Sequence, residues 1–455
     1  MSVVVIGAGI IGLCSARFLV EEGVRELTVI DSAPGAAQGT SLANGALIHP
    51  SSVEPWNSPG ILGTLIRDIG REDATVLLRL HAIPSLLAWG WRFWRESTPE
   101  RFLASARANT ALALQSLACM RRLDVQPDAF CGKDGGSLTV MREPAALEEA
   151  LRWSDKLAAQ GLRHQRLGRD ELIAREPALA PIARELAGGI HQPDDFAGDC
   201  HLFARCLAGQ LDALGVRLRW NSTVAEIILA PPGSSRAGKA AQASKGVAGV
   251  RLASGDIIPA STVVLASATG SVALAARLGV RLPVRPVKGY SLTYTLPRDT
   301  QAPRLPIIDR SLHIALTPLV DPRHRESIRL RVAGTAEFCG EDLRLSAARI
   351  GALDRLATQT YPRLRDVANG APPSPWTGLR PMCADGRPLI GATRIAGLFL
   401  NTGHGHLGWT VGAASGYALA RLIVGRPVGF AVDAFDPARF GLGQSCAVRS
   451  ERSQV

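Results

Sequence analysis

Apolar residues follow two different spacings along this chain, and each spacing predicts one kind of element. The continuous apolar run from Val3 to Ile6 predicts a short buried strand, and Leu27 to Ile30 predicts a second one. Between them, the apolar segment from Leu13 to Val20 predicts a helix. A strand, a helix and a strand in such close succession are typical of a βαβ unit with a parallel sheet.

Helical spacing of apolar residues returns over Ala82 to Arg122, Ala145 to Gln160 and Ser346 to Tyr361. Within the first of these segments, a Ser-Thr-Pro-Glu run at 97–100 is a helix start signal. Strand signals occupy Val216 to Ile228 and Val247 to Leu265. Helices and strands therefore alternate over most of the chain, which favours an α/β class.

The last third of the chain changes its pattern. From Val287 to Phe338, apolar and polar residues alternate, which predicts an antiparallel sheet. The segment Leu398 to Leu400 predicts a strand that leads into a helix ending near Val424. The small and polar run from Pro231 to Gly246 predicts a surface insertion, and we expect the polar tail beyond about Gly443 to be disordered.

Composition limits the possible classes of protein. The 455 residues are too many for one compact core and suffice for two domains. Lys and Arg number 51 against 40 Asp and Glu, a net charge of +11, which suggests an anionic neighbour such as a phosphorylated cofactor, a membrane surface or a carboxylate substrate. The Arg residues are scattered and no nucleic-acid motif is present, so we expect no nucleic-acid partner.

Cysteine usage and the N-terminal sequence bear on compartment. The eight cysteines form no C-x-x-C pair and no His/Cys ligand spacing, so we expect free thiols and no bound metal. The first strand begins at residue 3, which leaves no room for a cleavable leader. No apolar run reaches the ~18 residues that span a bilayer. We expect a cytoplasmic protein.

The glycines after the first strand carry the first chemical signal. Gly7, Gly9 and Gly12 form a Gly-x-Gly-x-x-Gly turn between strand and helix, and Asp31 ends the second strand. The first glycine permits the turn, the second admits a pyrophosphate to the backbone, and the third lets helix and strand pack closely. The helix N-terminus favours phosphate, and the acid is placed to accept a ribose hydroxyl. The sequence therefore predicts a bound dinucleotide.

Several further motifs, in this order, make the chain resemble the FAD-dependent D-amino-acid oxidase superfamily, which includes glycine oxidase and sarcosine oxidase, and within it the bacterial D-amino-acid dehydrogenases. The resemblance covers nearly the whole chain. The matching segments are Val3 to Gly12, Thr40 to Gly45, Pro55 to Gly60, Gly198 to Phe203, Pro286 to Thr293, Trp376 to Met382 with Asp385 and Gly386, and Asn401 to Thr410.

The resemblance implies a Rossmann-like FAD-binding domain interrupted by an α+β substrate domain with an antiparallel sheet. The expected FAD-binding domain comprises residues 1–80, 195–285 and 376–442. The expected substrate domain comprises residues 81–194 and 286–375.

The resemblance and the glycine turns together imply a non-covalent FAD site. We expect the 403–408 turn to place helix N–H groups at the flavin pyrimidine end, which argues for flavin over nicotinamide. His404 is expected to be a structural residue on the flavin side. The expected FAD-binding residues are Gly7, Gly9, Ile10, Ile11, Gly12, Asp31, Ser32, Thr40, Ser41, Asn44, Gly45, Val224, Ala266, Gly270, Gly403, His404, Gly405, Leu407 and Gly408.

Arg380, in a Gly-Leu-Arg-Pro motif, is the principal catalytic candidate. A guanidinium grips a carboxylate bidentately, and the resembled oxidases use an Arg of this motif in that way. Tyr290 is expected either to line the pocket or to pack in the core. His313 aligns with a carboxylate-binding tyrosine of glycine oxidase. His406 and His49 replace small polar residues of the dehydrogenases, so the three histidines leave the substrate open.

The implied reaction is oxidative deamination of D-amino acids to 2-oxo acids and ammonia, by hydride transfer from Cα to flavin N5. A quinone or another acceptor would take the electrons. The alternatives are turnover of a cyclic or N-substituted substrate such as D-proline, hydroxyproline, sarcosine or glycine, a non-catalytic flavin-binding subunit, and an NAD-dependent dehydrogenase. Aromatic and basic residues at 89–95 suit either helix packing or a peripheral site on the inner face of the bacterial inner membrane.

Overall fold

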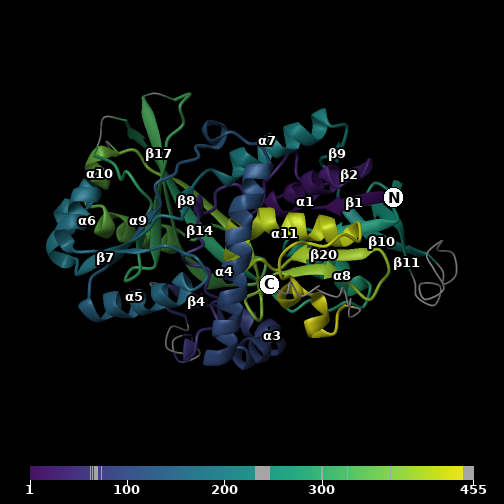
Figure 1. The fold of residues 1–455 in the computed structure, drawn as a ribbon, viewed down its shortest axis with the longest axis horizontal. Helices are drawn as coiled ribbons and strands as arrows, with labels where there is room; N and C mark the ends of the chain where they lie inside the picture. Colours follow the sequence, from purple (N-terminus) through teal and green to yellow (C-terminus); the bar gives the residue numbers. More distant parts are fainter. Residues whose placement is uncertain are drawn as a thin grey trace, which may run out of the picture.

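The computed structural model describes residues 1–61, 63, 65, 70–72, 74–230, 246–298, 301–324, 326–368 and 370–443. The insertion predicted from Pro231 to Gly246 lies outside these residues except for Gly246, which begins a strand, and the tail predicted beyond Gly443 lies outside them as well. Two halves stand side by side in Figure 1, and the long helix α4 (Pro99–Arg122) crosses between them. The N-terminal strands and the C-terminal helix belong to the same half, although the chain between them builds the other half.

A six-stranded sheet organises the first half within the described residues. Its strand order is β19-β20-β13-β1-β2-β9, and β1 pairs in parallel with β2 on one side and β13 on the other. Predicted strands at 3–6, 27–30 and 398–400 are therefore confirmed, and they lie in one sheet. The strands are β1 (Ser2–Ile6), β2 (Glu26–Ile30), β9 (Arg217–Arg219), β13 (Thr262–Leu265), β19 (Leu389–Ala392) and β20 (Leu398–Thr402).

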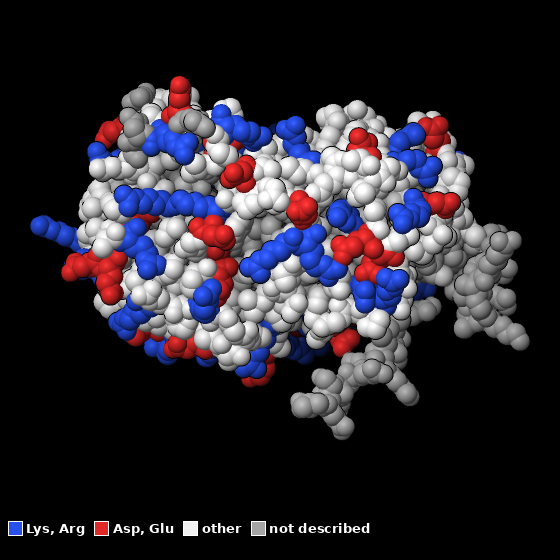
Figure 2. Space-filling view, turned by 45° about the horizontal axis from the view of Figure 1, so that its top comes forward, with Lys and Arg blue, Asp and Glu red and all other residues white. Residues whose placement is uncertain are grey.

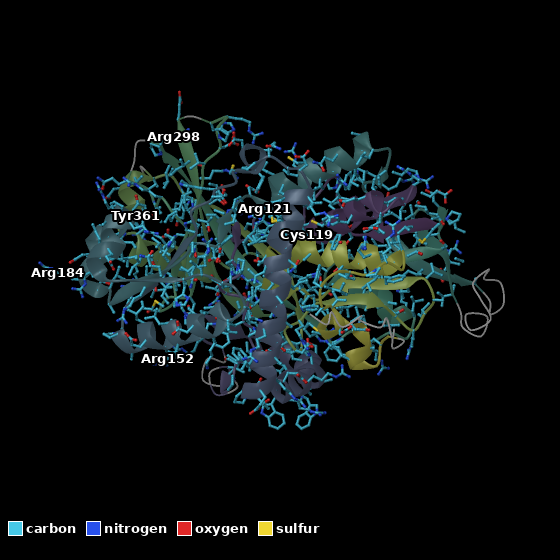
Figure 3. The ribbon with its side chains drawn as sticks, viewed as in Figure 1. Cys119, Arg121, Arg152, Arg184, Arg298 and Tyr361 are labelled. Carbon is cyan, nitrogen blue, oxygen red and sulfur yellow. The ribbon has the colours of Figure 1, made fainter. Side chains whose placement is uncertain are left out.

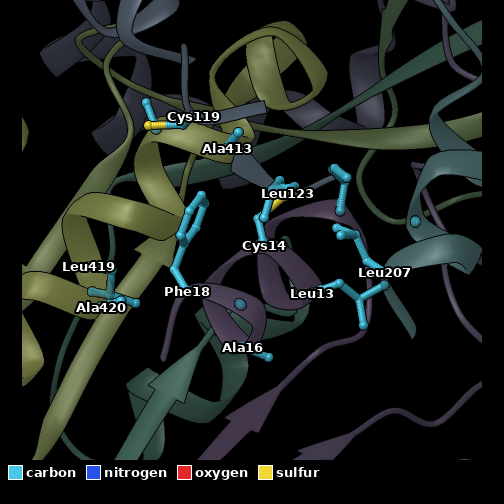
Figure 4. Packing of buried hydrophobic residues seen from close by; sticks show 14 of the residues in the cluster. Leu13, Cys14, Ala16, Phe18, Cys119, Leu123, Leu207, Ala413, Leu419 and Ala420 are labelled. Atoms are coloured by element: carbon cyan, nitrogen blue, oxygen red, sulfur yellow. The ribbon is translucent and has the colours of Figure 1, made fainter. Parts of the chain in front are cut away.

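Alternate residues of β1 pack into two different cores. Val3 and Val5 face α1 (Ile10–Glu21), α7 (Cys200–Ala213) and α11 (Gly408–Ile423), and this helix-covered core is seen in Figure 4. Val4 and Ile6 face a second core with a small antiparallel sheet. That sheet consists of β10 (Val224–Ala230), β11 (Gly246–Leu252) and β12 (Ile257–Pro259), with α8 (Gly270–Arg277) beside it. The alternation follows from the two-residue period of a strand buried on both faces.

A larger mixed sheet organises the second half. In the part of the chain that the structure describes, its order is β18-β14-β17-β16-β15-β5-β7-β6, with β4 paired to β17. The antiparallel pairing of β14, β16 and β17 confirms the sheet predicted at 287–338. The strands are β4 (Val76–Leu78), β5 (Ser137–Met141), β6 (Gln165–Leu167), β7 (Gly188–Gln192), β14 (Val284–Pro297), β15 (Ile307–Asp309), β16 (Ile314–Leu319), β17 (Ser327–Phe338) and β18 (Ser374–Cys383).

Helix α9 (Ala347–Thr360) covers one face of the larger sheet, and its Leu353 and Ala357 pack with Tyr290 in a core of their own. Figure 3 places Tyr361 in this half and Cys119 of α4 beside the other half. The remaining elements are β3 (Leu47–Ile48), β8 (Phe196–Ala197), α3 (Ile83–Arg95), α5 (Pro144–Ala158), α6 (Arg169–Arg175), α10 (Leu364–Val367), η1 (Leu80–Ala82), η2 (Pro127–Phe130), η3 (Pro177–Glu185), η5 (Gly405–Leu407), η6 (Asp433–Phe435) and η7 (Pro437–Phe440).

The helical region predicted over Ala82 to Arg122 consists of two helices, α3 and α4. The break lies at the predicted start signal, where the Thr98 hydroxyl accepts a hydrogen bond from the Arg101 N–H and Pro99 takes the first helical position. A capped N-terminus with proline at its first position fixes where a helix begins, so a continuous apolar pattern does not guarantee a continuous helix.

The predicted domain boundaries remain a proposal. Two strands lie in a different sheet from the one that those boundaries assign to them. Val76–Leu78 and Ser374–Cys383 both pair within the larger sheet, although the boundaries place 1–80 and 376–442 in the FAD-binding domain. The chain therefore crosses between the two halves within strand β18 and its following turn.

Charged residues of both signs are interspersed over the face in Figure 2. The excess of Lys and Arg thus does not form a single basic surface in that view. None of the helices described here combines the length and hydropathy that a membrane span needs.

Candidate active site

The glycine turn after β1 is built so tightly that side chains are excluded. Gly7 has φ +109°, and a Cβ on Gly12 would lie 1.8 Å from the Gly7 carbonyl oxygen. A Cβ on Gly7 would lie 2.6 Å from the carbonyl oxygen of Ala266, at the end of β13. Both contacts are with backbone atoms, which cannot rotate away. The turn therefore needs glycine at both positions, as the dinucleotide fingerprint predicts.

The N-terminus of α1 opens toward the loop that follows β2. Gly9 is the N-cap and has no side chain to bond the first helical N–H groups. The Ser41 hydroxyl accepts a hydrogen bond from the Ile10 N–H at 3.2 Å. Helix N–H groups without intrahelical partners favour a phosphate, so an anion-binding role for Ser41 and this helix end stays a prediction.

Asp31 holds the turn as well as facing the predicted ribose position. Its two carboxylate oxygens accept hydrogen bonds from the Ala8 N–H at 2.7 Å and the Ala33 N–H at 2.9 Å. A carboxylate has about four acceptor sites, so each oxygen keeps one for a hydroxyl group. The sequence pattern predicted only a ribose contact for Asp31, and its support of the glycine turn is seen only in the folded chain.

A cavity of about 430 Å³ lies beside the turn and brings distant segments together. Five predicted FAD-binding residues line it, namely Gly7, Asp31, Ser32, Val224 and Gly270. They lie in the turn after β1, at the end of β2, at the start of β10 and at the start of α8, and they are separated by up to 263 residues of sequence. Its other lining residues include Ser222, Thr223, Ser267 and Arg277, none of which the sequence analysis assigned to the site.

The loop from Thr40 to Gly45 joins the two halves. Its backbone carbonyls accept hydrogen bonds from three side chains of the larger sheet: Ser291 to Ala43 at 2.6 Å, Arg331 to Asn44 at 2.9 Å, and Thr317 to Gly45 at 2.9 Å. The Thr40 hydroxyl donates to the Leu379 carbonyl at 2.8 Å. Leu379 precedes Arg380, so the predicted cofactor loop is tied directly to the strand with the predicted substrate-binding residue.

The second glycine turn lies at the start of α11. Gly403 and Gly405 have φ +79° and +57°, and a Cβ on Gly405 would lie 2.7 Å from the Met382 sulfur. Leu407 is buried and Gly408 begins the helix, where it faces the side chain of Ile11 on α1. The N-termini of α1 and α11 therefore converge, as a cofactor held between them requires.

His404 points into the protein. Its Nε2 lies 3.1 Å from the Ser415 hydroxyl of α11, and burial lowers its pKa to about 3. A neutral, buried imidazole bonded to its own helix fits the structural role that the sequence analysis predicted.

Arg380 is a half-buried cation on β18. Its Nη1 donates to the carbonyl oxygen of Thr335 at 3.1 Å, and its guanidinium lies 5.5 Å from the ring centre of Trp56. Burial lowers its pKa to about 10 and is the one cause of the shift. Among the described residues no Asp or Glu forms an ion pair with it. A guanidinium has five N–H donors, so most of this group is available to an anionic ligand.

His406 adjoins this cation, and His49 adjoins His406. The ring of His406 stacks on Trp56 with centres 5.3 Å apart. Burial, then the charges of His49 and Arg380, hold the pKa of His406 well below its usual range. Burial also lowers the pKa of His49 to about 4, and its Nδ1 is buried with no described hydrogen-bond partner. Both imidazoles are therefore neutral at pH 7, and that of His406 offers hydrogen-bonding atoms beside the guanidinium.

Tyr290 lies on the other face of the sheet. Arg380 pairs with Val287, and in an extended strand Gly289 and Ser291 share the face of Val287 while Tyr290 does not. Its side chain is buried against α9, and its hydroxyl donates to Glu337 at 2.7 Å. The structure therefore favours the core-packing alternative for Tyr290 over the pocket-lining one.

His313 is not brought into the cluster around Arg380. It is exposed in the turn between β15 and β16, with φ +54°. Its carbonyl lies close to Gly334, the neighbour of Thr335, so the turn itself stands at the edge of the site. A substrate contact from this ring stays a prediction.

Three residues around Arg380 were missed as site residues: Trp56, Gly289 and Thr335. Trp56 belongs to a motif that was noted without a role. Gly289, in the Lys-Gly-Tyr-Ser motif of β14, carried the signal that glycine inside a strand marks a close approach. No sequence pattern pointed to Thr335, since its place beside Arg380 depends on how β17 pairs with β14.

Comparisons with known proteins agree with this geometry. The family model "FAD dependent oxidoreductase" (DAO) matches residues 2–422, so the chain belongs to this family of FAD-dependent oxidoreductases. It is 38% identical over 442 residues to a D-amino acid dehydrogenase of Paramagnetospirillum magneticum, covering 97% of this chain and 99% of that one.

Solved structures share the fold. An L-proline dehydrogenase from P. horikoshii superposes with a TM-score of 0.71 at 18% identity, covering 97% of this chain and 99% of that one. A glycine oxidase from Geobacillus kaustophilus gives a TM-score of 0.70 at 20% identity, covering 96% and 97%. The glycine turns, the converging helix N-termini and the lined cavity fit FAD. The individual contacts of the predicted FAD-binding residues stay predictions.

Proposed function

We propose that this enzyme catalyses FAD-dependent oxidative deamination of D-amino acids to 2-oxo acids and ammonia. The observation that carries the proposal is the half-buried guanidinium of Arg380, which lies beside the predicted cofactor loop without a described carboxylate partner. A cation held in this way needs an anion, and every amino acid supplies a carboxylate. The D-amino acid dehydrogenase that matches almost the full length supports the choice of substrate class.

The site residues supply position more than acid–base chemistry. Arg380 would hold the α-carboxylate bidentately and thereby turn Cα and its hydrogen toward the cofactor. Bound FAD supplies the two-electron acceptor for the hydride that leaves Cα. Water then hydrolyses the imino acid to the 2-oxo acid and ammonia.

His406 would contact the substrate through hydrogen bonding. Its pKa is held too low for it to store a proton near pH 7, so its imidazole acts as a neutral donor or acceptor. Its ring and that of Trp56 form one stacked wall next to Arg380. This wall would limit the size and shape of the accepted side chain.

We propose further that a quinone or another acceptor takes the electrons and that the enzyme lies peripherally on the inner face of the bacterial inner membrane. Helix α3 supports this location. Its Trp89 and Phe93 are buried, whereas Leu87 is 67% exposed, Trp91 59% and Trp94 48%. Exposed aromatic residues with neighbouring arginines suit a bilayer interface.

Helix α3 also lies next to the proposed site. The Trp89 ring nitrogen donates to the carbonyl of Met382, whose sulfur abuts Gly405. Trp56 packs against the same apolar cluster, which includes Trp89 and Met382. A membrane-binding face on α3 would thus be separated from the stacked rings of Trp56 and His406 by a single layer of side chains.

An anaerobic titration tests the main proposal. Purified enzyme with its FAD is mixed with D-alanine, D-proline, sarcosine and L-alanine in turn, and the flavin absorbance is followed. Bleaching by D-alanine and not by L-alanine is the expected result. Bleaching by D-proline or sarcosine alone would replace the proposal with a cyclic or N-substituted substrate, and persistent bands with all four would overturn it.

A further inference from the structure

Strand β17 contains a bulge opposite Gly289. Lys288 of β14 pairs with Glu337, whereas Tyr290 pairs with Gly334, so two residues of β17, Thr335 and Ala336, face the single residue Gly289. A bulge of this kind re-aims the backbone and is frequent next to active sites. The bulge lies where the Arg380 guanidinium crosses β14.

The first bulge residue has an unusual backbone. Thr335 has φ +59°, a region that β-branched residues rarely adopt. Its carbonyl oxygen is the acceptor for Arg380 Nη1 at 3.1 Å. Asparagine and glycine adopt this conformation with less strain, so the presence of threonine calls for a role of its side chain.

The Thr335 side chain has an unsatisfied polar atom. The residue is 7% exposed, and its buried Oγ1 has no hydrogen-bond partner among the described residues. Two and four residues before it, Ala333 lies against Gly45 and Arg331 donates to the Asn44 carbonyl. Thr335 lies at the end of this row of β17 residues, and the hydrogen bond from Arg380 to its carbonyl places it at the guanidinium.

We propose that Thr335 is a substrate-binding residue. Its hydroxyl donates a hydrogen bond to the same carboxylate that Arg380 holds, while its carbonyl orients the guanidinium. This inference rests on the proposed function for the identity of the ligand, an α-carboxylate. A buried hydroxyl is satisfied by such a ligand, and a hydrogen bond to a charged group is stronger than one between neutral groups.

The test separates the hydroxyl from the carbonyl. T335V removes the hydroxyl and keeps both the branched shape and the backbone carbonyl, and T335S keeps the hydroxyl. T295V is the matched control, because Thr295 is exposed on β14, roughly 27 Å along the strand from Val287. Each holoenzyme is titrated with propionate, which is D-alanine without its amino group, by the shift in flavin absorbance. The KM and kcat for D-alanine are measured alongside.

We expect T335V to raise the dissociation constant of propionate and the KM for D-alanine about tenfold, equivalent to ~1.4 kcal/mol. We expect kcat, the flavin spectrum without ligand and the melting temperature to stay unchanged. T335S should remain within about threefold of wild type in both constants, and T295V should match wild type.

Unchanged propionate binding in T335V would overturn the inference, as would equal losses in T335V and T335S, or a loss of bound flavin in T335V. The propionate titration does not depend on turnover. A wild-type enzyme that binds propionate but oxidises no D-amino acid would therefore refute the proposed function while T335V still tests Thr335.

Discussion

The guanidinium of Arg380 lies directly over the backbone of Gly289, so closely that a Cβ at position 289 would stand 2.5 Å from its Cζ and Nη2. The two residues belong to neighbouring strands, β18 and β14, on the same face of the sheet. A glycine in a strand interior weakens the strand, and here it gives the cation room to cross to Thr335 on the third strand. The position of the Arg380 guanidinium, the proposed carboxylate-binding group, thus depends on the absence of a side chain at Gly289.

Replacing Gly289 with alanine should displace the guanidinium without removing it. We expect the KM for D-alanine to rise about tenfold or more in G289A, because small misplacements of binding groups are costly. Steady-state kinetics measure the change. G209A is the control, since Gly209 on α7 has nothing within 4 Å of the added methyl group. Wild-type KM in G289A would show that the guanidinium does not bind the substrate from this position.

Exchanging Arg380 for lysine keeps the charge and loses the planar fork. We expect kcat/KM for D-alanine to fall about 100-fold in R380K, because an ammonium cannot bond a carboxylate bidentately or hold the Thr335 carbonyl in the same geometry. Flavin content should remain at the wild-type level. A wild-type kcat/KM in R380K would show that a positive charge at this position suffices and that bidentate binding of the carboxylate is not needed.

Alanine at Gly12 should prevent FAD binding. Its Cβ would overlap the Gly7 carbonyl oxygen, and no side-chain rotation relieves a contact between backbone-fixed atoms. We expect G12A to be purified without flavin absorbance, or not to fold. G209A again serves as the control. A stoichiometric flavin content in G12A would contradict the close packing of this turn.

Acid should destabilise the folded state through its buried histidines. The pKa of His404 is lowered to about 3 and that of His49 to about 4, both below the ordinary value of 6.5. Between pH 6.5 and about 4 the unfolded chain therefore binds more protons than the folded one, and stability falls as the pH falls. Denaturant unfolding at pH 7 and pH 4 measures this loss.

The variant H404N should reduce the loss of stability between pH 7 and pH 4, because asparagine does not titrate in this range. H324N, a change at an exposed histidine, is the control. An H404N enzyme with the same pH dependence as wild type would place the acid sensitivity elsewhere.

The exposed face of α3 should bind anionic lipid. We expect wild-type enzyme to cosediment with vesicles of anionic phospholipid and the double variant W91S/W94S to lose most of this binding. Turnover with a soluble dye as acceptor should be unchanged. L214S, a change at the exposed leucine that follows the C-terminus of α7, should bind as wild type does. Equal binding by W91S/W94S would remove α3 as the membrane face.

Much of the cofactor-binding half could be predicted from the sequence, because its signals are local. The strand, the glycine turn and Asp31 occupy the first 31 residues, and Gly12 packs on the backbone of Gly7, five residues before it, although the backbone that Gly7 meets at Ala266 is distant in the sequence. Arg380 could be found for a related reason, since its motif resembles a known one. The start of α4 at Pro99 could also be predicted from the sequence, because Thr98 and Pro99 form a helix start signal. This signal ends the continuous helical spacing of apolar residues at that point.

Tertiary structure alone decided what surrounds Arg380. Tyr290 and Gly289 are adjacent in sequence, and only the register of β14 with β18 shows that one faces the core and the other the guanidinium. Trp56 and His406 stack across 350 residues of chain. Strand pairing and bulges form between segments distant in sequence, and a one-residue change of register exchanges the faces of every side chain. The sequence by itself determined the cofactor class and the proposed carboxylate-binding residue, and the folded sheet determined which residues share a site with it.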